Sequence, residues 1–165
     1  MRIELIQPFV NATDAVLAEM LRGPARVTQV TMDEEVYRRK GVAASISIHG
    51  DIEGRIIFDL EPETAMRVAG ALAGEEVEPS EELASETVCE LANIVVGNAV
   101  TLLNDQGHSF KVFPPQLHTA ATGYAGDCTS EALVMCFESA SGKVHLNIAL
   151  DYSGQSSAFT AEASA

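Results

Sequence analysis

The sequence predicts an α+β fold in which helices cover one face of a mainly antiparallel sheet. Two observations predict this class. Stretches with apolar residues at helical spacing alternate with groups of short, strand-like segments, and a helix followed by three strands occurs twice along the chain. The repeated order indicates an internal αβββ duplication, although the two halves share no matching residues. We expect a sheet of about six strands in one domain over residues 1–152, followed by a flexible tail at 153–165.

The first half of the chain is expected to hold one helix and three strands. Apolar residues at helical spacing predict a helix over 11–21, and the Gly23-Pro24 pair ends it. The second of the three strands ends in an alternation of apolar and polar residues, which indicates one buried and one solvated face. The strands are predicted over 26–31, 42–49 and 55–60.

Two helices open the second half. A Glu-Pro-Glu run at 61–63 begins the first, because a proline in the first turn loses no helical hydrogen bond, and Gly74 ends it. Ser80 is the predicted N-cap of a longer helix that reaches about residue 103, with two glutamates in its first turn. Strands are then predicted over 110–113, 133–138 and 143–152, with a long loop after the first and a hairpin joining the other two.

Composition and charge argue against several classes of function. The formal net charge of −14 is opposite in sign to what binding of nucleic acid or an anionic membrane surface requires. No apolar run approaches the roughly 20 residues of a membrane span, and the N-terminus lacks a secretory signal profile. The cysteines at 89, 128 and 136 show no CxxC spacing, and the histidines are scattered. We therefore expect a cytoplasmic protein with no metal site of its own.

The segment 85–100 carries the pattern that points to function. Placed on a helix at about 100° per residue, its residues divide into two opposed sets. The apolar set, predicted to be buried, consists of Val88, Leu91, Val95, Ala99 and Leu102. The set on the opposite side, predicted to be exposed within an arc of about 60°, consists of Glu86, Glu90, Asn93 and Gly97. Glu90 and Asn93 lie one turn apart, so their side chains are neighbours.

The exposed set has the features of a docking surface. Gly97 lies in mid-helix at a cost of about 1 kcal/mol relative to alanine, which a helix shaped only for solubility would rarely carry. Val96 and Val100 are expected to flank the polar residues on one side and Ile94 on the other. A polar centre, apolar rims and bare backbone therefore predict a surface for another protein. The alternative is that the polar residues are simply the solvated side of an amphipathic helix, because Glu-x-x-Asn is a common string.

These residues resemble the CheC/CheX/FliY family of chemotaxis phosphatases. The family pattern is a small or acidic residue followed by a glutamate, an asparagine and a glycine, and it is matched by Glu86, Glu90, Asn93 and Gly97. The position of Glu86 is more usually Asp or Ser in that family. The stretch 7–12 is similar to the start of the family's first helix, and the order of elements fits from about residue 1 to 152.

Within that family the chain is most similar to the single-site CheX type. A two-site CheC would carry a second Glu-x-x-Asn in its other half, whereas the first helix here reads Asn11-Ala12-Thr13-Asp14, with no glutamate three residues before an asparagine. A FliY-like chain would also need room for a flagellar switch domain. The resemblance implies a homodimer, and we expect an unpaired edge strand near 110–113 or at the terminal hairpin to serve as its contact.

The resemblance also implies an activity: hydrolysis of the phospho-aspartate of a CheY-like response-regulator receiver. On this hypothesis Asn93 orients the attacking water, Glu90 pairs with the receiver's active-site lysine, and Gly97 allows close approach. The divalent cation, Mg²⁺, would belong to the receiver, so the chain is expected to need no cofactor of its own. A non-catalytic receiver-binding or scaffold module and a structural subunit of a larger complex are the alternatives.

Overall fold

The computed structural model of the chain describes residues 3–21, 25–33, 37–74, 78, 80–119 and 131–153. The helices in this part of the chain are α1 (Ile3–Met20), α2 (Pro62–Ala73) and α3 (Glu81–Asp105). The strands are β1 (Arg26–Asp33), β2 (Val42–Gly50), β3 (Ile52–Leu60), β4 (Phe110–Val112), β5 (Gln116–His118), β6 (Ala132–Ser139) and β7 (Gly142–Tyr152). Helices on one sheet confirm the expected α+β class.

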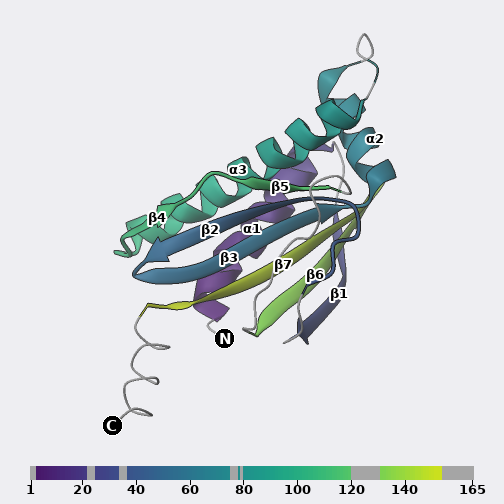
Figure 1. Cartoon of the computed structure of the whole chain (residues 1–165). Coiled ribbons are helices and arrows are strands. Elements are labelled where there is room, and N and C mark those ends of the chain that lie inside the picture. Colours follow the sequence, from purple (N-terminus) through teal and green to yellow (C-terminus); the bar gives the residue numbers. More distant parts are fainter. Residues whose placement is uncertain are drawn as a thin grey trace.

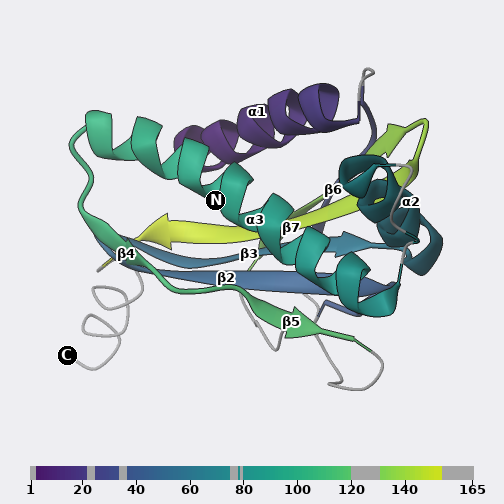
Figure 2. The ribbon, with the colours of Figure 1, turned by 90° about the horizontal axis from the view of Figure 1, so that it is seen from above.

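All seven strands belong to one antiparallel sheet in the order β1-β6-β7-β3-β2-β4. The short strands β4 and β5 follow one another along the same side of β2, where they pair with its two ends. Helices α1 and α3 run across one face of this sheet, and α2 lies at one end of it (Figures 1 and 2). The segment 85–100 therefore belongs to a helix layer that rests on one face of a seven-stranded sheet.

The strand order agrees with the αβββ duplication. Each strand has a counterpart in the other half: β1 corresponds to β4 and β5, β2 to β6, and β3 to β7. When every strand is replaced by its counterpart, the order from one edge of the sheet equals the order from the other edge. Each half folds its last two strands into a hairpin, and each hairpin is paired on its outer side by the first strand of the other half. The two halves therefore interlock in a single sheet and share one core.

Helix α3 is the central element of that core. Among the described residues it is the one helix whose length and apolar composition would allow it to cross a membrane. Its apolar side packs against α1, α2 and β2, so the composition is explained by its position as a core helix. The apolar residues of β2, β3 and β7 that face the helices complete the cluster, with Phe58, Leu146 and Ile148 fully buried.

Three predicted elements differ from the structure. The helix predicted over 11–21 begins at Ile3 and contains Pro8, because burial of Leu5, Ile6 and Phe9 in the core offsets the hydrogen bond that the proline cannot make. Strand β5 was expected to be loop, since three residues after two prolines are too short to show a strand period. The third strand begins at Ile52 rather than residue 55.

One of the two expected edge positions is confirmed and the other is wrong. Strands β4 and β5 do form one edge of the described sheet, as expected near 110–113. The β6–β7 hairpin is not an edge, because β1 pairs with β6 and β3 pairs with β7. The other edge is β1. The predicted helix stop at Gly23-Pro24, Cys128 and the tail from residue 154 onward lie outside the described residues.

Candidate functional site

The functional helix begins where the sequence predicts. The Ser80 side-chain oxygen accepts a hydrogen bond from the Leu83 backbone N–H at 3.1 Å, and the Ser80 carbonyl accepts the first helical bond from Ala84. Glu81 and Glu82 occupy the first turn, where the helix dipole favours negative charge. The N-cap fixes the start of α3 and therefore the rotational position of every side chain along it.

The division of α3 into a buried and an exposed side follows the predicted pattern closely. Val88, Leu91, Val95 and Ala99 are each at most 1% exposed. Leu102, predicted to continue this stripe, is 45% exposed, and its neighbour Leu103 is buried instead. The last turns of α3 extend past the N-terminal end of α1 (Figure 2), so α1 does not cover this end of the helix.

The predicted exposed set is confirmed as exposed. Glu86, Glu90, Asn93 and Gly97 all lie on the solvent side of α3. Among the described residues, neither Glu90 nor Asn93 forms a side-chain hydrogen bond or ion pair with another group. A carboxylate and an amide one turn apart are thus free to engage a second molecule without breaking a contact within the chain.

Gly97 has no packing role within the chain. A Cβ added at this position would meet nothing within 4 Å. The carbonyl of Gly97 accepts a hydrogen bond from the Thr101 hydroxyl at 3.0 Å, and α3 continues through the glycine without interruption. The patch of bare backbone therefore faces outward, toward whatever approaches the helix.

The apolar rims of the exposed set are smaller than predicted. Ile94 and Val100 are half-buried and pack against the core, so each presents part of its side chain beside the polar residues. Val96 is only 1% exposed, and its predicted place in a docking rim is wrong. The buried side of α3 is therefore wider than the helical wheel predicts, because the helix contacts β2 and β5 as well as α1 and α2.

The thiol beside the exposed set is Cys89. Its side chain is half-buried and packs against the core, and burial raises the pKa of the thiol. A protonated, partly covered thiol is a poor nucleophile. Cys89 is therefore a weak candidate for a nucleophile.

No metal-binding site is evident among the described residues of this face. The described residues contain no group of three or more His, Cys, Asp or Glu side chains arranged to hold a metal ion. Two of the histidines pair with neighbouring side chains: His118 Nε2 lies 3.0 Å from the Ser45 hydroxyl, and His49 stacks edge-on against Phe113.

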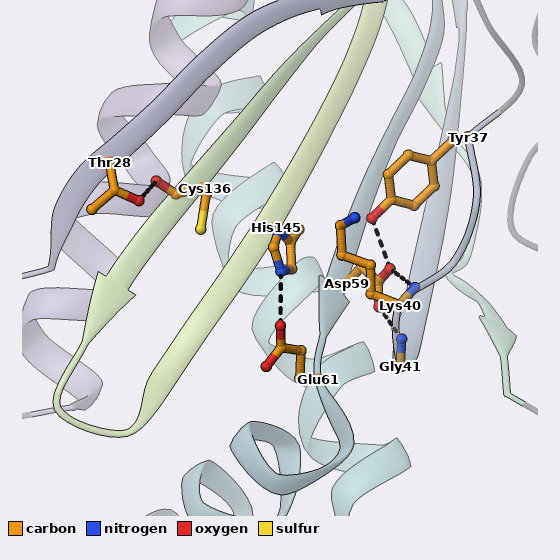
Figure 3. Close-up of polar contacts among 8 residues, drawn as sticks. All are labelled: Thr28, Tyr37, Lys40, Gly41, Asp59, Glu61, Cys136 and His145. Atoms are coloured by element: carbon orange, nitrogen blue, oxygen red, sulfur yellow. Dashed lines mark hydrogen bonds and ion pairs between the residues drawn. The ribbon is translucent and has the colours of Figure 1, made fainter.

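A buried polar network on the opposite face of the sheet was not predicted from the sequence. The Asp59 carboxylate accepts hydrogen bonds from the Tyr37 hydroxyl at 2.7 Å, the Lys40 backbone N–H at 2.6 Å and the Gly41 backbone N–H at 2.9 Å (Figure 3). Burial, followed by the charge of Asp59, raises the pKa of Tyr37. The network fastens the segment before β2 to strand β3.

His145 lies beside this network. It is the cross-strand partner of Asp59 on one side and of Cys136 on the other. Its Nε2 lies 3.6 Å from the Glu61 carboxylate, at the junction of β3 and α2 (Figure 3). Burial lowers the pKa of His145, and the nearby charge of Lys40 lowers it further. Alternating polar residues in β3 and β7 suggest a solvated face, so no sequence signal indicated that these groups would be buried together.

Comparison with known proteins gives consistent results. Residues 42–138 match the family model described as chemotaxis phosphatase CheX. The CheY-P phosphatase CheX of Thermotoga maritima is 35% identical over 71 residues, which are 42% of this chain and 46% of that protein. The match therefore spans less than half the length of this curated relative.

Solved structures show the same fold. A CheC-like superfamily protein from Shewanella sp. PV-4 superposes with a TM-score of 0.78 at 23% identity, over 92% of this chain and 99% of that one. A chain of the CheX-CheY-BeF3-Mg+2 complex from Borrelia burgdorferi superposes with a TM-score of 0.66 at 31% identity, over 90% of this chain and 99% of that one.

Proposed function

Because the chain belongs to the CheX family of chemotaxis phosphatases, we propose that it hydrolyses the phospho-aspartate of a CheY-like receiver domain. The observation that carries this proposal is the exposed pair Glu90 and Asn93 on α3, which has no competing partner among the described residues. The Thermotoga relative is a CheY-P phosphatase, and the Borrelia relative forms a complex with CheY. Both facts support a receiver as the substrate.

In the proposed mechanism, water attacks the phosphorus atom in line with the bond to the receiver's aspartate. The new P–O bond forms as the bond to the aspartate breaks, inorganic phosphate leaves, and the aspartate carboxylate is regenerated. The Asn93 amide orients this water and needs no change of protonation. Glu90 pairs with the lysine of the receiver and sets the register of the two proteins. Such a reaction depends on positioning and charge stabilisation more than on a new nucleophile.

We place the divalent cation of the reaction, Mg²⁺, in the receiver. Mg²⁺ is held by several oxygen ligands in octahedral geometry, whereas the proposed catalytic turn offers one carboxylate and one amide. Glu86, Ile94, Val100 and the bare backbone at Gly97 would form the surrounding contact surface. In this arrangement the chain inserts side chains into a site that the receiver has already built.

We further propose that residues 1–152 act as one cytoplasmic unit and pair as a homodimer. The edge strand β1 offers an apolar surface for this contact: Val27, Val30 and Met32 are 40%, 54% and 45% exposed. Between Arg26 and Asp33 at its two ends the strand carries no charge, and an edge strand without charged residues favours pairing with another strand. This position replaces the terminal hairpin, which lies inside the sheet.

The test is loss of phosphate from purified receivers of the same organism, phosphorylated with a small phosphodonor. The wild-type chain should accelerate dephosphorylation of at least one receiver, and Asn93→Ala should abolish the effect. Asn98→Ala is the matched control, because Asn98 is also exposed on α3 but lies outside the exposed set. Phosphorylation-dependent binding without hydrolysis would instead support a receiver-binding module. Equal rates for wild type and the Glu90→Ala/Asn93→Ala double variant would contradict the proposal.

A further inference from the structure

A cavity opens beside the first two turns of α3. It has a volume of about 490 Å³ and lies where the starts of β2, α2 and α3 meet. This volume is in the range of small-molecule and side-chain binding sites. Its lining combines the apolar side chains of Val42, Met66 and Ala84 with the polar side chains of Glu81, Glu82 and Ser85, and one basic residue, Arg39, also lines it. Both glutamates are exposed, whereas Ala84 is buried, so the carboxylates stand at the mouth and the apolar groups lie deeper.

One wall of the cavity is fastened by the buried network. Arg39 and Gly41 belong to this wall. The Gly41 N–H is held by Asp59, and the Arg39 guanidinium donates to the Gly41 carbonyl. The wall is therefore held by contacts within the chain, and the cavity is preformed, which lowers the entropic cost of filling it.

A row of carboxylates leads along α3 from the cavity toward the proposed catalytic surface. Glu82, Glu86 and Glu90 are spaced four residues apart, so their carboxylates form a row along the exposed side of α3. Like charges at this spacing destabilise a helix slightly, and only Glu82 lies in the first turn, where the helix dipole compensates. Among the described residues none of the three has a basic partner. Repulsion between these carboxylates therefore destabilises the helix slightly, and a basic group of a binding partner would reduce that repulsion.

The proposed catalytic surface is too small to hold a receiver alone. A stable protein–protein contact buries about 800 Å² on each partner and involves roughly 20–30 residues a side. Glu86, Glu90, Asn93, Gly97 and their rims supply only a fraction of this area. At about 1.5 Å per residue, Glu82 lies about 16 Å from Asn93 along the helix axis, well within the reach of one receiver.

We propose that this cavity is a second receiver-binding site, which takes a lysine or arginine side chain from the phosphorylated receiver and thereby selects among receivers. The inference rests on the proposed phosphatase function. A long basic side chain can bury its aliphatic stem against Val42 and Met66 while its cation meets the carboxylates of Glu81 and Glu82. A receiver with an acidic residue at the corresponding place would meet like charges and be rejected.

The test is steady-state kinetics with a phosphorylated receiver that the wild-type chain dephosphorylates. Glu81→Gln/Glu82→Gln should raise KM about 3- to 10-fold and leave kcat unchanged, because exposed ion pairs contribute to binding and not to the chemical step. The KM of this variant should also depend less on salt. Met66→Lys, which adds a second cation of the chain to the cavity besides Arg39, should raise KM in the same way.

The matched control is Glu19→Gln/Glu138→Gln, which removes the same charge from exposed positions on α1 and β6. It should change KM less than about 2-fold. An equal rise in this control would show a general charge effect and overturn the inference. Unchanged KM in both cavity variants, with wild-type hydrolysis intact, would overturn the inference and leave the proposed function standing. Absence of hydrolysis by the wild type on every receiver would instead remove the proposed function itself.

Discussion

Helices α1 and α3 lie against each other on the same face of the sheet and differ in their chemistry. In α1, the amide of Gln7 donates to the side-chain oxygen of Asn11 at 2.8 Å, so the asparagine is already engaged. The residue three positions before Asn11 is Pro8, which is buried and carries no polar group. In α3, Asn93 is preceded at the same spacing by Glu90, and both are exposed and unpartnered among the described residues.

This difference shows that the duplicated fold supplies a scaffold twice but a candidate site once. Both helices bury an apolar side in the same core, and both turn polar residues to solvent. Only α3 leaves a carboxylate and an amide side by side without an internal partner. The function is therefore a property of a few side chains on one helix and does not follow from the topology.

The largest expected effect comes from deleting the polar pair on each helix. Glu90→Ala/Asn93→Ala should lower the rate of receiver dephosphorylation by about 100-fold or more, because the attacking water loses its positioning group. Gln7→Ala/Asn11→Ala on α1 should leave the rate unchanged. A phosphate-release assay under saturating receiver checks both. A comparable loss of rate in the α1 variant would show that the polar residues of the two helices do not differ in function.

The next largest effect is a difference in stability between loss of a buried carboxylate and loss of an exposed one. Asp59→Ala should destabilise the chain by about 3 kcal/mol or more, because the Tyr37 hydroxyl and two backbone N–H groups would remain buried without a hydrogen-bond acceptor. Glu90→Ala should leave the free energy of unfolding within about 0.5 kcal/mol of wild type. Urea denaturation measures both. Tyr37→Phe, which removes one of the three bonds, should give an intermediate loss of about 2 kcal/mol.

Substitution of Gly97 tests whether the exposed backbone of α3 contributes to the stability of the chain or to binding of the receiver. Gly97→Ala should stabilise the protein by about 1 kcal/mol and raise Tm by about 2–4 °C, because the added methyl meets open space and the unfolded chain loses freedom. The same variant should weaken receiver binding. Thermal melts and receiver titration should thus move in opposite directions, and a variant that is more stable with unchanged binding would remove the docking role of Gly97.

The smallest expected effect is a pH dependence that originates in the second half of the sheet. The folded state lowers the pKa of His145, so the neutral ring is favoured in the folded chain. This contribution to stability is fully present above about pH 6.5, where the unfolded chain is also neutral, and is lost as the pH falls through the lower pKa of the folded state. His145→Gln should flatten the stability profile between pH 7 and 5, and an unchanged profile would show that other groups dominate it.

Much of the candidate site could be predicted because it lies within one helix. The cap at Ser80 and the apolar spacing of Val88, Leu91 and Val95 set the rotation of α3, and that rotation places Glu90 and Asn93 outward. Val96 and Leu102 were misplaced for one reason. Their burial depends on which neighbouring elements cover each turn of α3, and no local pattern contains that information.

The sequence by itself determined the class of fold, the faces of α3 and the family, because helical and strand periods and a short motif are local properties of the chain. Tertiary structure alone decided which strands are edges, the burial of Asp59 with Tyr37 and His145, and the cavity at the start of α3. Each of these depends on contacts between residues far apart in the chain. The sheet edges, the place of His145 beside Asp59 and the cavity form only when the two halves interlock, whereas Tyr37 and Asp59 meet within the first half, where the segment before β2 lies against β3. None of these contacts leaves a mark on the local spacing of residues.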